Sequence, residues 1–195
     1  MPSRFERRNT RIDSLREQVW TLHCRWAHFR DLFSSPENID LFNDCAPRLF
    51  ADIKQALYVD IVLTACRLVD GSANTVSLVK IVAELKPELS PERNLTLSEA
   101  LASAVAASVP LRTQRDEAFA HTAASPTMNV GPWIPPAGIQ AFVDAVWKVS
   151  QLVECAAGRE SVGPADIDCN NDATSFTRAL RQGVASLRQQ RIRGA

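Results

Sequence analysis

The fold is decided by residues 11–33, which read RIDSLREQVWTLHCRWAHFRDLF. The apolar side chains in this stretch recur at alternating intervals of three and four residues: Ile12, Leu15, Val19, Leu22, Trp26, Phe29 and Phe33. This spacing places them on one side of an α-helix. A helix of some 25 residues has a length of about 37 Å. We therefore expect a long amphipathic helix that needs a long partner, either in its own chain or in a second copy.

Further helices are expected along the rest of the chain. Residues 47–69 are apolar nearly all round, which is typical of a central helix. A helix with Thr96 at its N-cap runs to Pro110, which kinks or interrupts it before the helical pattern resumes. Two more helices are expected within residues 137–192. The sequence thus predicts an all-α bundle with about five substantial helices in a single domain, residues 1–195.

The charge balance and the apolar runs exclude some classes of protein. The chain has 22 Lys and Arg against 22 Asp and Glu, so its zero net charge rules out a generally polybasic nucleic-acid binder. The N-terminus lacks a secretory signal, and the longest weakly polar run, residues 100–111, is too short to span a bilayer. We expect a cytoplasmic protein without a membrane contact.

The last helix carries five arginines: Arg178, Arg181, Arg188, Arg191 and Arg193. These side chains could bind a phosphate backbone, because each neutralised phosphate releases counterions. A solvated face on a terminal helix is the more common explanation of such a pattern.

Neither a metal site nor a cofactor is expected. The five cysteines form an odd set without a Cys-x-x-Cys pair, which favours free thiols in a reducing compartment. His23 and His28 are five residues apart, whereas helical metal ligands are spaced by three or four. The segment that begins at Asp166 resembles a calcium loop, but its sixth position is Asn171 instead of glycine.

A polar stripe interrupts the apolar helix of residues 47–69. Asp60, Thr64 and Arg67 share one helical face, and Asp70 follows Arg67 by one turn. The stripe is either a buried or half-buried ion pair that fixes the helix register, or the lining of a functional cleft.

The strongest candidate motif lies in residues 111–121, which read LRTQRDEAFAH. Arg115 and His121 are separated by five residues, and the small polar residue Asp116 follows the arginine directly. The same region ends on an apolar residue, alanine and histidine. In a regular α-helix, six positions separate two side chains by about 9 Å and 120°, so one copy cannot easily bring both groups to one phosphate.

These residues resemble the Arg-x4-6-His motif of the HEPN superfamily, the nucleotide-binding helical domains of higher eukaryotes and prokaryotes. Upstream features resemble one branch, the abortive-infection AbiU-type (AbiU-two-like) proteins. Those features are Trp26-x-x-Phe29-Arg30-x-Leu32-Phe33, Ile39-Asp-Leu-Phe-Asn43, Ala46-Pro47, Phe50, Asp60-Ile61, Arg67-Leu-Val-Asp70 and Asn94-Leu95. The resemblance is strongest over residues 20–123.

The resemblance implies a HEPN-like bundle that serves as a defence protein or toxin against phage. It implies a metal-independent endoribonuclease with Arg115 and His121 as catalytic residues and Asp116 in support. It further implies a homodimer that brings both copies of the motif together, an RNA substrate, and an antitoxin or nucleotidyltransferase as partner. The alternatives are a non-catalytic HEPN-like bundle that binds a protein partner or a nucleotide, and a helical scaffold without a nucleic-acid role.

Overall fold

The computed structural model describes residues 3–72, 75–119, 133–161 and 170–193. Every regular element in these ranges is a helix, which confirms the all-α prediction. Five helices are long: α1 (Arg4–Phe33), α3 (Pro47–Leu68), α5 (Pro91–Ala107), α7 (Pro136–Ala156) and α8 (Asn170–Arg193). Short elements join them: α2 (Pro36–Cys45), α4 (Leu78–Leu85), the 3-10 helix η1 (Lys86–Glu88), α6 (Val109–Gln114) and the π-helix η2 (Arg115–Phe119).

Helix α1 has the amphipathic character that its sequence predicts. All seven apolar residues of its seam, from Ile12 to Phe33, are buried. The chain then turns at Ser35, whose hydroxyl accepts a hydrogen bond from the backbone N–H of Asn38 at 3.3 Å. Pro36 starts α2 because a proline in the first turn gives up no helical hydrogen bond.

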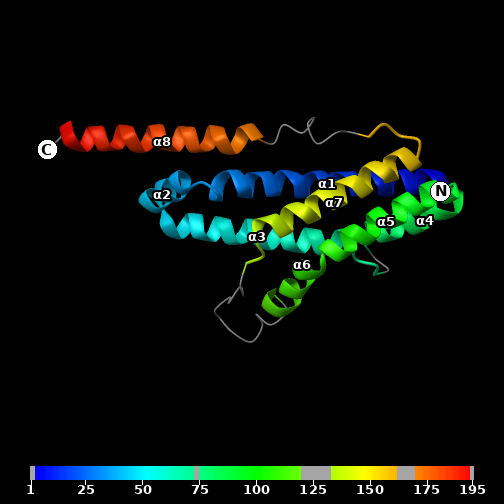
Figure 1. Cartoon of the computed structure of the whole chain (residues 1–195). Coiled ribbons are helices and arrows are strands. Elements are labelled where there is room, and N and C mark those ends of the chain that lie inside the picture. Colours follow the sequence, from blue (N-terminus) through cyan, green and yellow to red (C-terminus); the bar gives the residue numbers. More distant parts are fainter. Residues whose placement is uncertain (1–2, 73–74, 120–132, 162–169, 194–195) are drawn as a thin grey trace. The chain divides into compact units, whose positions relative to one another are not determined.

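Two compact units make up the chain, and the first comprises residues 1–23 and 60–166. Within it α7 packs against α4 and α5, and α4 also contacts α5 (Figure 1). Helix α7 contributes a buried stripe that includes Ile139, Phe142, Val146 and Val153. This unit holds the α6–η2 segment with the candidate motif.

The second unit comprises residues 24–59 and 167–195, and its core is a chain of aromatic rings. Phe33 contacts Phe42 edge-on at 5.6 Å between ring centroids, and Phe42 stacks on Phe50 at 4.0 Å. Phe50 in turn lies 6.3 Å from Phe176 of α8. Aromatic pairs in this distance range are favourable beyond their burial, so they tie α1, α2, α3 and α8 together inside this unit.

Two local expectations differ from the structure. Helix α5 begins at Pro91 with Ser90 as its N-cap, so Thr96 lies inside the helix, where its hydroxyl donates to the carbonyl of Glu92. Cys24 is disulfide-bonded, so the expectation of free thiols is wrong for this residue, although Cys45, Cys66 and Cys155 are free. Cysteine spacing in an odd set carries no information about such a pair. The single domain over residues 1–195 stays a prediction.

Candidate functional site

Arg115 lies where α6 passes into a wider helical turn. Pro110 sits in the first turn of α6, directly after α5 ends, so the predicted interruption at this proline is confirmed. The α-helix ends at Arg115, and Arg115–Phe119 form the π-helix η2. Single π-turns are rare and occur frequently at functional sites.

The Arg115 side chain is bound by the residue that follows it. Its Nε and Nη2 atoms donate to Oδ1 of Asp116 at 2.8 and 2.7 Å. The side chains are 37% and 62% exposed, so the pair faces solvent. The hydrogen bond to Asp116 raises the pKa of Arg115, and partial burial opposes the increase. A guanidinium has five N–H donors, so others remain that could contact an oxyanion.

Asp70 is a second acidic residue beside Arg115. Its carboxylate accepts the backbone N–H and the hydroxyl of Ser72, each at 2.9 Å. These hydrogen bonds lower the pKa of Asp70, and the positive charge of Arg115 lowers it further. Because its ordinary pKa is already acidic, Asp70 is ionised at neutral pH. Arg115 therefore lies in the field of two carboxylates.

Cys66 on α3 is the buried neighbour of this site. Burial raises the pKa of its thiol to about 11, and the positive charge of Arg115 opposes that increase. The thiol is thus neutral at physiological pH and is not an activated nucleophile.

Two members of the polar stripe of α3 are joined by a hydrogen bond. Thr64 is buried, and its hydroxyl accepts a hydrogen bond from Nη2 of the exposed Arg67 at 3.3 Å. Asp70 interacts with Ser72 and Arg115 instead. Sequence reasoning had singled out Asp70 by its place in the stripe, but no sequence signal connected it to Arg115.

His121 lies outside the described residues, so its position relative to Arg115 is untested. The π-helix also changes the geometric argument. The separation of about 120° assumed a regular α-helix, and the turn that begins at Arg115 is wider. The estimate for Arg115 and His121 stays an expectation, because it involves a residue outside the described ranges.

Two of the five arginines of α8 bind acidic or amide groups on α2. Arg181 donates to Oδ1 of Asn38 at 2.6 Å, and Arg188 pairs with Asp44 at 2.7 Å. These contacts stay within the second unit. At least Arg181 and Arg188 therefore form contacts between α8 and α2.

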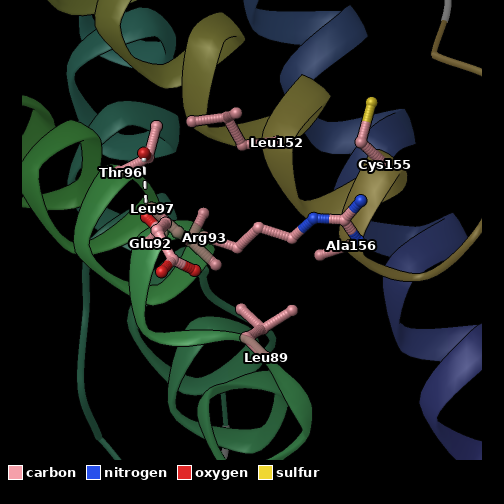
Figure 2. A pocket seen from close by; sticks show the side chains of 8 residues that line it. All are labelled: Leu89, Glu92, Arg93, Thr96, Leu97, Leu152, Cys155 and Ala156. Atoms are coloured by element: carbon pink, nitrogen blue, oxygen red, sulfur yellow. Dashed lines mark hydrogen bonds between the residues drawn. The ribbon is translucent and has the colours of Figure 1, made fainter.

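A hollow of about 250 Å³ lies between α5 and α7 in the first unit. Figure 2 draws the side chains that line it. Its walls are largely apolar and include Leu89, Leu97 and Leu152. The Arg93 side chain extends along it toward Ala156. Among the described residues of the motif, neither Arg115 nor Asp116 lines this hollow.

Two features are absent from the described residues. No described helix is long and apolar enough to cross a membrane. In the same part of the chain, His, Cys, Asp and Glu residues do not gather in groups of three or more that could hold a metal ion.

The all-α fold agrees with a HEPN-like helical bundle. A sequence model of the HEPN AbiU2 family matches residues 9–136, about two thirds of the chain, and the chain belongs to this family. The match contains Arg115, Asp116 and His121, whereas α8 lies beyond it. Neither a curated protein nor a solved structure matches the chain.

Proposed function

We propose that this chain is an abortive-infection defence protein that cleaves RNA without a metal ion, with Arg115 and His121 as its catalytic residues. The observation that carries the proposal is the family match over the complete Arg-x5-His segment. Arg115 supports it as a permanently charged and partly exposed side chain in a π-turn. The toxin role and the cytoplasmic location belong to the same proposal.

The chemistry follows from the two side-chain types. The imidazole of His121 takes the proton of the ribose 2′-hydroxyl as the 2′-oxygen attacks phosphorus, and a histidine returns a proton to the departing 5′-oxygen. Histidine suits both steps because its ordinary pKa of about 6.5 lies near neutrality. Arg115 stabilises the extra negative charge on the phosphorane oxygens through charge-assisted hydrogen bonds.

The proposal includes a homodimer in which the motifs of two copies face one cleft. Such pairing supplies two arginines and two histidines to one RNA backbone, so one histidine can act as base and another as acid. An antitoxin or a nucleotidyltransferase is the proposed partner that controls the activity.

A second candidate is a non-catalytic bundle that binds a protein partner or a nucleotide. The bond between Arg115 and Asp116 favours it, because the neighbouring carboxylate takes two guanidinium donors that an RNA phosphate would otherwise use. In that case Arg115 recognises an anionic group without any bond being broken.

The test is incubation of the purified chain with mixed RNA in excess chelator. We expect cleavage by the wild type and a loss of about 10²–10⁴-fold in His121→Ala. Arg115→Gln lowers the cleavage rate by about 10²–10³-fold, as expected for the removal of one oxyanion donor. Arg112→Gln is the matched control, because it removes an arginine one turn earlier and leaves the motif intact. Equal cleavage by wild type and His121→Ala would assign the activity to a contaminant, and binding without cleavage favours the second candidate.

A further inference from the structure

A second pocket of the first unit lies between α1 and α7, on residues that the proposed ribonuclease does not use. It has a volume of about 170 Å³. Its lining is Arg16, Val19, Trp20, Trp147, Ser150, Gln151 and Glu154. This pocket differs from the apolar hollow of Figure 2, because buried polar groups line it.

The most buried polar group of this pocket is a carboxylate. Glu154 is only 3% exposed, and Ser150 is also buried. A carboxylate is rarely buried without a cation close by, because removal from water strongly disfavours its charge. One cation close to it is Arg16, whose Nε lies 3.8 Å from Oε1 of Glu154. That distance defines an ion pair but is too long for a hydrogen bond.

Two indole rings complete the pocket. Trp147 is largely buried, whereas Trp20 is 40% exposed at the surface of α1. The face of an indole ring attracts cations, and a planar guanidinium can stack on it. A buried carboxylate with indole walls is therefore complementary to a planar organic cation.

We propose that this pocket binds a guanidinium group, with the Glu154 carboxylate as its counter-ion and Trp20 and Trp147 as its walls. The guanidinium comes either from a small molecule or from an arginine side chain of a protein partner. Arg16 competes for the same carboxylate from within the chain. Because the Arg16 side chain is 45% exposed and its pairing distance is long, an incoming guanidinium can displace it.

The experiment is a calorimetric titration of the full chain with methylguanidinium, compared with methylurea. Methylurea has nearly the same shape without the charge, so we expect binding of methylguanidinium alone. Glu154→Gln weakens that binding by about tenfold or more, because hydrogen bonds to a charged group are the stronger ones. Trp20→Ala weakens it by about twofold or more through the lost cation–π contact. Thermal unfolding of each variant verifies that the fold is intact. If Glu154→Gln does not fold, Trp20→Ala still tests the pocket, because Trp20 is exposed.

Arg16→Met gives the most specific result. Removal of this internal competitor raises the affinity for methylguanidinium by about two- to fivefold, because the partly exposed Arg16 pairs only weakly with the carboxylate at 3.8 Å. Arg7→Met, an exposed arginine on the same helix that does not line the pocket, leaves the affinity unchanged. A weaker affinity in Arg16→Met, equal binding of methylurea, or undiminished binding by Glu154→Gln overturns the proposal.

A second titration distinguishes the two sources of the guanidinium. N-acetyl-arginine amide carries the same group on a peptide backbone. Tighter binding of this compound than of methylguanidinium points to an arginine of a protein partner, and weaker binding points to a small molecule. Failure to bind either compound, in the wild type and in Arg16→Met, overturns the proposal without affecting the ribonuclease.

Discussion

Replacement of Asp116 by asparagine tests how the structure holds Arg115. The carboxylate binds two guanidinium nitrogens at 2.8 and 2.7 Å, but both side chains face solvent. An exposed pair of this kind contributes about 0.2–1 kcal/mol to stability. For a chain of this size, 1 kcal/mol corresponds to a change in Tm of about 2–4 °C. We therefore expect the Tm of Asp116→Asn to fall by no more than about 4 °C.

The effect on RNA cleavage follows from the same geometry. If Asp116 orients Arg115, loss of up to about 1 kcal/mol of orientation reduces kcat/KM by at most about fivefold. Arg115→Gln removes the charge itself and reduces kcat/KM by about 10²–10³-fold. The assay is single-turnover cleavage of a defined RNA in excess chelator, with Tm measured on the same samples.

Two outcomes refute this reasoning. A loss in Asp116→Asn as large as that in Arg115→Gln means that Asp116 takes part in the chemistry itself. Faster cleavage by Asp116→Asn means that the Asp116 carboxylate keeps Arg115 from binding RNA. That result contradicts the supporting role of Asp116 and favours the binding function.

Three further predictions concern stability and thiol chemistry. Phe42→Ala removes the ring that contacts Phe33 edge-on and stacks on Phe50, and it lowers the free energy of unfolding in urea by about 3–5 kcal/mol. A decrease under about 1 kcal/mol contradicts the aromatic core. Gly158→Ala lowers the free energy of unfolding by about 1–2 kcal/mol because Gly158 has φ 71°. Gly183→Ala raises it by about 1 kcal/mol, because Gly183 lies inside α8 with open space around it. Changes of the same sign for both variants in urea unfolding contradict the assigned backbone. Iodoacetamide at pH 8 labels the exposed Cys155 first and leaves Cys66, with its pKa of about 11, unlabelled until the chain unfolds. Mass spectrometry of the peptides measures the order of labelling, and early labelling of Cys66 contradicts its burial.

The sequence predicts the helices well because their signals are local. The seam of α1 repeats every three or four residues, and Pro110 marks the junction of α5 and α6 by its own covalent structure. The start of α5 was placed wrongly at Thr96 because Ser90 followed by Pro91 gives an equally good capping signal a few residues earlier.

The site could be predicted only in part, because its contacts join distant residues. Arg115 and Asp116 are adjacent in sequence, so their pairing was foreseeable. The electrostatic interaction of Asp70 with Arg115 joins residues 45 positions apart in the chain, and no spacing rule encodes it. The π-turn at Arg115 was also unforeseen, since helical patterning assumes a regular α-helix.

The measurement that tests the central claim most directly is the rate of RNA cleavage by His121→Ala and wild type, purified identically and assayed at pH 7 in excess chelator. We predict chelator-resistant cleavage by the wild type and a rate about 10²–10⁴-fold lower for His121→Ala, since the variant lacks the proton-transfer group. Equal rates for the two proteins, or cleavage that the chelator abolishes, would contradict the account.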